Sequence, residues 1–237
     1  MIHILFLPGL LCTEQLFSGQ ISNLPVEFSS DCIILPLGKT MEEISETIWA
    51  GISGNIILVG LSMGGIIAME MYRQQPERIL GMVLLDSNSY DEVKTVSEAR
   101  WKLVDRAKEI GPGEMSLSLL LHSLVHFKNI KEPFIKRSVF EMAEKYGILR
   151  FISHAHALSS RQNYSEILTR INIPVLIMHG SGDQLCPVEF HKHLQTLIPG
   201  SRRIAIDDCG HLSSLEKPEL VSEYLNKWLE EHFSWKN

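Results

Sequence analysis

The stretch Ile56–Gly65, with the sequence IILVGLSMGG, decides the fold of this 237-residue chain. Its consecutive apolar residues are typical of a strand that is covered on both faces. A Gly-x-Ser-x-Gly motif centred on Ser62 follows, and the next residues have the pattern of a helix. Glycines two positions before and after Ser62 permit a sharp strand-to-helix turn, which would place the serine hydroxyl above the sheet. The alternative is a glycine-rich helix start with Ser62 as its capping residue.

Apolar runs of this kind recur along the chain and alternate with amphipathic segments. We expect about six strands, at Ile2–Leu7, Cys32–Leu35, Ile56–Val59, Leu80–Leu85, Val175–Met178 and Arg203–Ile206. Strands that alternate with helices over short connections predict an α/β fold with a doubly wound, mostly parallel sheet.

Residues 87–170 interrupt the alternation, because they contain no convincing strand. We expect helices there, at Glu92–Ile110, Glu114–Phe127, Glu132–Tyr146 and around Phe151–Leu158. We interpret residues 87–170 as a helical cap inserted into a core made of residues 1–86 and 171–237. Five apolar cap residues are expected to shape an apolar pocket or to pack the cap onto the core: Leu117, Leu120, Leu121, Leu124 and Phe127.

Composition and charge exclude several classes of protein. The chain has 22 Lys and Arg against 28 Asp and Glu, a net charge of −6, which argues against a nucleic-acid partner. No apolar run is long enough for a membrane span, and the first residues lack the features of a signal peptide. The four cysteines form no paired framework, so we expect reduced thiols and a cytoplasmic protein. Cys12, Cys186 and Cys209 are interpreted as small buried residues, with a redox-sensitive cluster as the alternative.

A serine hydroxyl needs a general base to act as a nucleophile. His211 follows the last predicted strand, at the sheet edge where Ser62 is expected to emerge. Asp183 follows the fifth strand, and its carboxylate would orient His211, which gives the chain order Ser, Asp, His. Asp86, at the end of the fourth strand, is the alternative acid.

Acyl transfer also needs N–H donors aimed at the developing oxyanion. One candidate is the backbone N–H of Met63, the residue after Ser62, and the other is that of Leu10, after the first strand. Gly9 is expected to let the chain turn so that the Leu10 N–H faces the site. The alternative is a plain turn between a strand and a helix.

These motifs, in order Leu7–Cys12, Gly60–Gly65, Gly182-Asp183 and Asp208–His211, resemble those of the α/β-hydrolase fold superfamily over nearly the whole chain. The similarity is to compact bacterial serine hydrolases of the esterase and enol-lactonase kind. It implies cleavage of small carboxylic esters or lactones through an acyl-enzyme, with a small-molecule partner and no cofactor or metal. Many members have His-Gly where this chain has Pro8-Gly9, but the role of a backbone donor should survive. A monomer or a homodimer is expected.

Other functions stay open at this point. The same fold and triad also serve C–C bond hydrolysis, lyase steps in cofactor biosynthesis, thioester hydrolysis and perhydrolysis. A non-catalytic receptor for a small ligand is a further alternative, since a fold does not fix a function. His122 and His126 have a spacing that can bind zinc on a helix, but the H-E-x-x-H pattern is absent, so we expect no metal there.

Overall fold

Six parallel strands form one sheet in the computed structural model, which describes residues 1–233. The strands are β1 (Ile2–Leu7), β2 (Phe28–Cys32), β3 (Ile56–Leu61), β4 (Ile79–Leu85), β5 (Val175–Gly180) and β6 (Arg202–Ile206). Their order in the sheet is β2-β1-β3-β4-β5-β6, and every neighbouring pair is parallel. The predicted α/β fold class is confirmed. The strand order reverses between β1 and β3, and open α/β sheets bind ligands at such a point.

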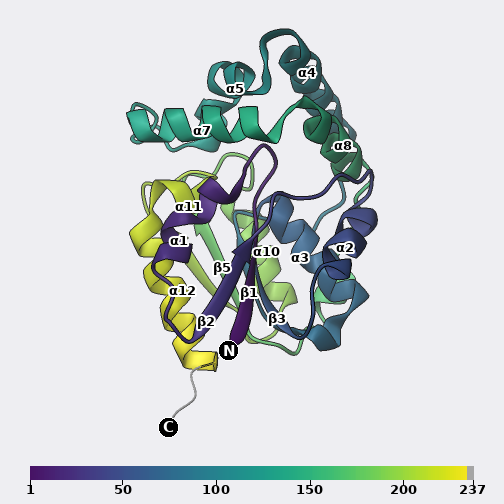
Figure 1. The fold of residues 1–237 in the computed structure, drawn as a ribbon, viewed down its shortest axis with the longest axis vertical. Helices are drawn as coiled ribbons and strands as arrows, with labels where there is room; N and C mark the ends of the chain where they lie inside the picture. The colour runs from purple at the N-terminus through teal and green to yellow at the C-terminus, as the bar shows by residue number, and fades with distance from the viewer. Residues whose placement is uncertain (234–237) are drawn as a thin grey trace.

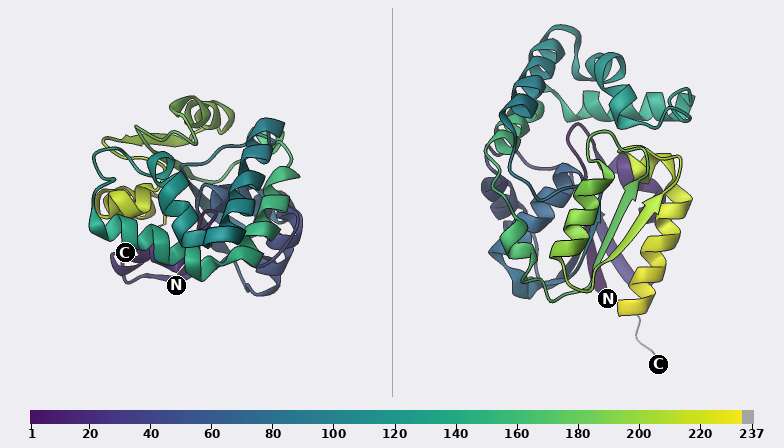
Figure 2. Two further views of the ribbon diagram at one scale, coloured as in Figure 1. Left: turned by 90° about the horizontal axis from the view of Figure 1, so that it is seen from above. Right: turned by 180° about the vertical axis from the view of Figure 1, so that it is seen from behind.

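Helices cover both faces of the sheet. One face carries α2 (Met41–Ala50), α3 (Met63–Gln74) and α10 (Val188–Leu197). The other carries α1 (Ser18–Ser22) and α12 (Pro218–Phe233), with α11 (Ser213–Glu216) just before α12 (Figures 1 and 2). Residues along β1 alternate between the two cores, Leu5 packing on the first face and Phe6 on the second. Burial on both faces explains why the central strands are almost continuously apolar.

The second strand lies earlier in the chain than the sequence pattern predicted. The strand is Phe28–Cys32 and pairs with β1 along its whole length, so the prediction of Cys32–Leu35 was wrong. Three of its residues are Ser29, Ser30 and Asp31, which an edge strand tolerates because only one of its sides is paired. Leu35 is buried beyond the strand, in the core beside α2 and α3, and this burial explains the apolar run that misled the prediction.

Only helices and loops connect β4 to β5. The helices are α4 (Lys94–Ile110), α5 (Pro112–Met115), α6 (Leu121–Leu124), α7 (Pro133–Tyr146), α8 (Ile148–Ser159) and α9 (Ser165–Leu168). Four of them, α4, α5, α7 and α8, lie above the carboxyl ends of the strands (Figures 1 and 2). No helix within residues 1–233 is long and apolar enough to cross a membrane.

The predicted helix Glu114–Phe127 is not continuous. It is divided into the end of α5, a π-helical stretch at Ser116–Leu120 and the short α6, which ends at Leu124. A π-helical turn inserts one extra residue into a helix and is often found beside a functional site. Here the stretch lies over the sheet edge and contributes Ser116 and Leu120 to a pocket.

Candidate active site

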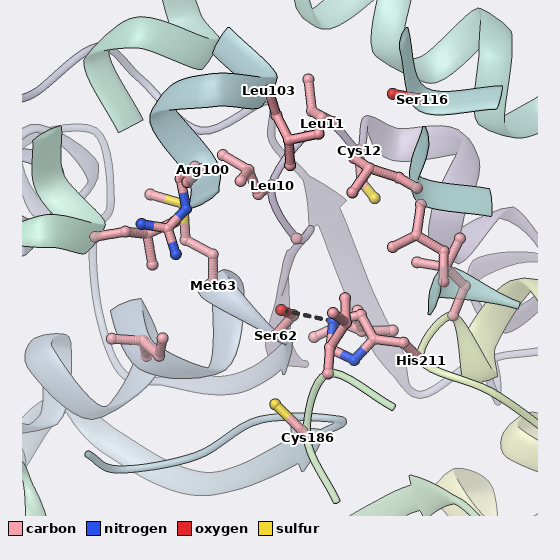
Figure 3. Close-up of a pocket in the computed structure, with 18 of the residues that line it drawn as sticks. Leu10, Leu11, Cys12, Ser62, Met63, Arg100, Leu103, Ser116, Cys186 and His211 are labelled. Atoms are coloured by element: carbon pink, nitrogen blue, oxygen red, sulfur yellow. Dashed lines mark hydrogen bonds between the residues drawn. The ribbon is translucent and has the colours of Figure 1, made fainter. Parts of the chain in front are cut away.

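Ser62 occupies the turn between β3 and α3. Its φ of 55° and ψ of −115° lie in a region that residues with a side chain rarely adopt. The turn is tight, because a Cβ atom at Gly64 would lie 1.8 Å from the carbonyl oxygen of Leu7, and one at Gly60 would lie 2.4 Å from that of Gly64. The Ser62 side chain makes no capping hydrogen bond to α3, so the capping alternative has no support. The hydroxyl instead faces a pocket at the carboxyl edge of the sheet (Figure 3).

His211 lies beside Ser62, in the loop that follows β6. Its Nε2 atom is 2.8 Å from the Ser62 Oγ atom (Figure 3). The ring is buried, and only 4% of the residue is exposed. The sequence places the two residues 149 positions apart, and the parallel sheet brings them together because both follow the carboxyl end of a strand.

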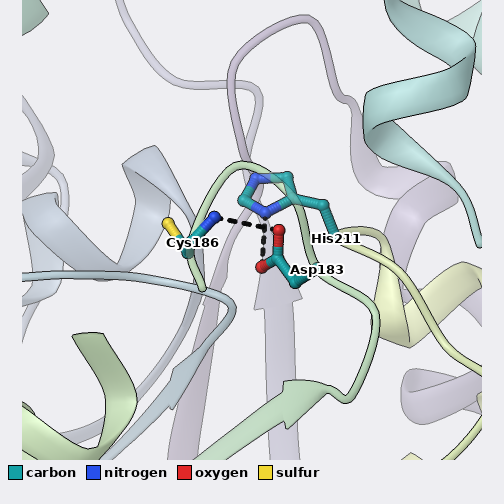
Figure 4. Close-up of side chains that lie close together, drawn as sticks. All are labelled: Asp183, Cys186 and His211. Atoms are coloured by element: carbon teal, nitrogen blue, oxygen red, sulfur yellow. Dashed lines mark hydrogen bonds and ion pairs between the residues drawn. The ribbon is translucent and has the colours of Figure 1, made fainter. Parts of the chain in front are cut away.

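Asp183, in the loop after β5, completes a chain of hydrogen bonds. Its Oδ2 atom is 2.8 Å from His211 Nδ1, and its Oδ1 atom accepts the N–H of Cys186 at 2.9 Å (Figure 4). The Oδ1 atom also accepts the N–H of Leu185 at 2.8 Å. A carboxylate can only accept, so Nδ1 carries the hydrogen, and the lone pair on Nε2 is left to accept from the Ser62 hydroxyl. This is the tautomer that a general base needs.

The charges of the two residues reinforce each other. Burial by itself would lower the pKa of His211, but the charge and hydrogen bond of Asp183 outweigh it and raise that pKa above its ordinary value. Burial would raise the pKa of Asp183, yet His211 and the two backbone N–H donors bring it below its ordinary value. The arrangement therefore favours an ionised Asp183 and stabilises a proton on His211.

Asp86, the alternative acid, makes no hydrogen bond with His211. Its carboxylate accepts the N–H groups of Gly180 at 2.9 Å and Ser213 at 3.3 Å, and is fully buried. The carboxylates of Asp86 and Asp183 approach within 4.8 Å. Burial, followed by the charge of Asp183, raises the pKa of Asp86 well above its ordinary value. Asp86 thus ties the loop before Asp183 to the residues after His211.

The two predicted N–H donors of the oxyanion site, those of Leu10 and Met63, lie next to Ser62. Neither amide has a hydrogen-bond partner within the part of the chain that the structure describes. The Leu10 amide lies in a turn closed by the Cys12 N–H donating to Gly9 O at 3.1 Å. Leu11 has the positive φ of this turn, 60°, and Gly9 instead gives close packing, since a Cβ there would lie 3.3 Å from Leu61 O. The predicted reason for Gly9 was therefore wrong.

The pocket above these groups has a volume of about 280 Å³ and a largely apolar wall. Leu120 and Leu124 line it, as expected of apolar residues in the helical segment, which is residues 87–170. Leu121 and Leu117 pack into the core, and Phe127 is 72% exposed, so its predicted place in the pocket or core was wrong. Phe127 falls beyond the end of α6, where the chain has already left the helix.

Sequence reasoning missed three charged residues of the pocket wall: Glu92, Arg100 and Arg161. We call them the charged cluster. Glu92 and Arg100 are eight residues apart, and Arg161 lies 69 residues after Glu92. No local motif joins them, and only the packing of α8 beside α4 brings them together. The sequence offers no signal for the cluster, because the burial that requires these charges to be paired is seen only in the structure.

The groups that could bind a metal overlap the residues described above. Two groups could supply three metal ligands within residues 1–233: Asp183 with Cys186 and His211, and Asp183 with Asp86 and His191. Both groups use Asp183, so a metal at either one would disrupt the hydrogen bond between Asp183 and His211. His122 and His126 belong to neither group. All four cysteines lie in the described residues and are free, and burial raises the pKa of the Cys12 thiol to about 12.

The sheet order, the sharp turn at Ser62 and the helices on both faces are features of one known fold family. A sequence model of the α/β-hydrolase fold matches residues 51–218. The chain therefore belongs to the α/β-hydrolase fold family of hydrolases, which confirms the resemblance noted in the sequence.

Three individual proteins are similar to this chain at identities of 17% to 24%. A pimeloyl-[acyl-carrier protein] methyl ester esterase from Aromatoleum aromaticum is 23% identical over 202 residues, which cover 77% of each chain. A thermophilic esterase from Thermogutta terrifontis has a TM-score of 0.88 at 24% identity, and the match covers 99% of this chain and 91% of the esterase chain. The enol-lactonase from Burkholderia xenovorans LB400 has a TM-score of 0.85 at 17% identity, and the match covers 96% of this chain and 91% of the enol-lactonase chain. At these identities the two structures establish the fold.

Proposed function

We propose that the protein is a serine hydrolase that cleaves small carboxylic esters or lactones. The observation that carries this proposal is the chain of two 2.8 Å hydrogen bonds from Ser62 Oγ through His211 to Asp183, located at a pocket. A receptor would need no such chain, because binding alone does not require an activated serine. The names of the esterase and lactonase relatives favour the same class of substrate.

In this mechanism Ser62 Oγ attacks the substrate carbonyl while His211 Nε2 accepts the hydroxyl proton. Asp183 holds the ring and stabilises the imidazolium that forms. The negative charge on the carbonyl oxygen is met by the N–H groups of Leu10 and Met63, which have no partner within residues 1–233. His211 then donates its proton to the departing alcohol oxygen. Water, deprotonated by His211, cleaves the acyl-enzyme and restores the hydroxyl of Ser62.

We also propose that residues 87–170 act as a cap on a core of residues 1–86 and 171–237. Four of their helices, α4, α5, α7 and α8, lie over the carboxyl edge of the sheet (Figure 1). Arg100 and Ser116 belong to the pocket wall (Figure 3), as do Leu120 and Leu124. A cap in this position excludes water from the reacting groups and shapes the space for the acyl chain.

Turnover of a substrate panel tests the proposed function. The panel contains p-nitrophenyl esters of increasing acyl length, lactones of matched length and acyl thioesters, each assayed with the wild-type protein and with Ser62→Ala. We expect hydrolysis of at least one oxygen ester or lactone by the wild-type protein, and a loss of about 10³-fold or more in the variant. Hydrolysis of thioesters alone would move the activity to another class, and equal rates for the two proteins would reject Ser62 as the nucleophile.

A further inference from the structure

The charged cluster of Glu92, Arg100 and Arg161 lies on the wall of the same pocket as Ser62 and His211. Glu92 is in the loop between β4 and α4, Arg100 is on α4, and Arg161 follows α8. Their side chains are 1%, 12% and 10% exposed. Three charges are thus largely removed from water, and removal from water is costly unless each charge is paired.

The charges within the cluster do not cancel. Glu92 is held by both arginines: its Oε1 atom accepts from Arg100 Nη2 and from Arg161 Nη1, each at 2.6 Å, and its Oε2 atom accepts from Arg100 Nη1. Burial alone would raise the pKa of Glu92, but these arginine contacts lower it, so the carboxylate is ionised at neutral pH. Two cations and one anion leave one net positive charge in a largely apolar pocket.

Donor groups of the cluster also remain unused. Arg161 donates through Nε to the carbonyl oxygen of Tyr90 at 2.8 Å and through Nη1 to Glu92. Within residues 1–233, Arg161 Nη2 and Arg100 Nε have no hydrogen-bond acceptor. A guanidinium group presents its N–H groups in a planar fork that matches the two oxygens of a carboxylate.

The charge and shape of the pocket indicate the class of anion. A single net positive charge is matched by one carboxylate, and a phosphate dianion would leave an excess negative charge in the same apolar space. The Arg100 guanidinium lies across the pocket from His211 (Figure 3). Leu103 and Met63 lie on the pocket wall beside it, as expected for a space that holds a hydrocarbon chain.

We propose that the substrate is an ester or lactone that carries a carboxylate group remote from the reacting carbonyl, and that Arg100 and Arg161 bind that carboxylate. The proposal rests on the serine hydrolase function and names the substrate class of the same site. In it, Glu92 is a positioning residue that aligns the two guanidinium groups and limits the net charge of the cluster.

Matched substrates test the selectivity. The p-nitrophenyl monoesters of glutaric, adipic and pimelic acid are compared with the p-nitrophenyl esters of pentanoic, hexanoic and heptanoic acid, so that each pair differs only in a terminal carboxylate or methyl group. We expect kcat/KM to favour the carboxylate at one length or more by about tenfold, the usual scale of a charge-assisted hydrogen bond. Added salt should reduce that ratio. A preference for the methyl-terminated ester at all three lengths would overturn the proposal.

Four variants assign the ratio to particular residues. Arg100→Met and Arg161→Met should each bring the ratio close to one. Glu92→Gln removes the competing anion, so the ratio should rise, a change that loss of structure would not produce. Arg106→Met is the matched control, because Arg106 is also on α4 but pairs with Glu109 at the surface, and its ratio should equal that of the wild-type protein. A ratio that Arg100→Met and Arg161→Met both leave unchanged would contradict the proposal.

A binding measurement separates this proposal from the proposed function. Ser62→Ala protein is titrated calorimetrically with monomethyl adipate and with methyl hexanoate, with and without the Arg161→Met substitution. Tighter binding of monomethyl adipate that depends on Arg161 supports carboxylate recognition even if no ester is hydrolysed, in which case only the hydrolase function fails. If esters are hydrolysed and the two ligands bind equally, the hydrolase function stands and carboxylate recognition fails.

Discussion

The backbone N–H of His211 donates to the carbonyl oxygen of Leu124 at 3.0 Å. Leu124 ends α6, so the proposed general base is attached to the helical segment above the sheet as well as to the sheet itself. Glu216 reinforces the attachment, since its carboxylate accepts the N–H of Gly210 at 2.8 Å and that of His126 at 2.9 Å. The helical segment therefore helps to hold His211 in place and contributes residues to the pocket wall.

Replacing Glu216 tests this attachment. Glu216→Gln puts an N–H₂ group opposite backbone N–H donors, which should cost about 1–3 kcal/mol of unfolding free energy. We expect kcat to fall as well, because the loop that carries His211 loses one of its anchors. Urea unfolding and steady-state kinetics measure both effects. The control is Glu223→Gln, an exposed position on α12, and equal behaviour of the two variants would refute the role of Glu216.

Backbone strain at Ser62 should lower the free energy of unfolding. The positive φ of Ser62 costs a residue with a Cβ atom more than it costs glycine. Ser62→Gly and Ser62→Ala both remove the hydroxyl, so their comparison isolates the strain. We expect the glycine variant to be more stable than the alanine variant by about 1 kcal/mol in urea unfolding. An alanine variant of equal or greater stability would show that the turn is not strained.

The positions of the proposed catalytic residues could be predicted because each follows a strand, and parallel strands end at one edge. Ser62 also has glycines around it that serve the turn. β2 was misplaced because Ser29, Ser30 and Asp31 do not have the apolar pattern of a strand, and the pairing with β1 decides their structure. The charged cluster could not be predicted, because it forms only when α8 packs beside α4. The helix expected at Glu114–Phe127 is interrupted before Leu121. The sequence could not predict this interruption, because no proline or glycine occurs between Gly113 and Leu121.

The pH dependence follows from the raised pKa of His211. Catalysis needs the neutral ring, because an imidazolium cannot accept the Ser62 proton. A pKa raised above 6.5 means that the ring stays protonated to higher pH, so kcat/KM should decrease as the pH falls through a midpoint above 6.5. The profile is measured from pH 5 to pH 9 with a neutral ester. A midpoint below 6.5 would show that Asp183 does not stabilise the imidazolium in the free protein.

The two buried aspartates should differ in what they support. Asp183→Asn removes the acceptor that selects the tautomer of His211, and should lower turnover by about 10⁴-fold while the fold is kept. Asp86→Asn should lower the free energy of unfolding by about 1–3 kcal/mol, because one of two backbone N–H donors loses its acceptor. Its effect on turnover should be much smaller than that of Asp183→Asn. Kinetics and urea unfolding of both variants check the assignment. A larger loss of turnover in Asp86→Asn would make Asp86 the functional acid.

The central claim is that Ser62 is a nucleophile activated by His211. Its most direct test is intact-protein and peptide mass spectrometry after treatment with a fluorophosphonate probe, which reacts much faster with an activated serine than with other side chains. We predict one adduct per chain, located at Ser62, with no adduct in Ser62→Ala and strongly slowed labelling in His211→Ala. An unlabelled wild-type protein, or an adduct on another residue that persists in Ser62→Ala, would contradict the claim.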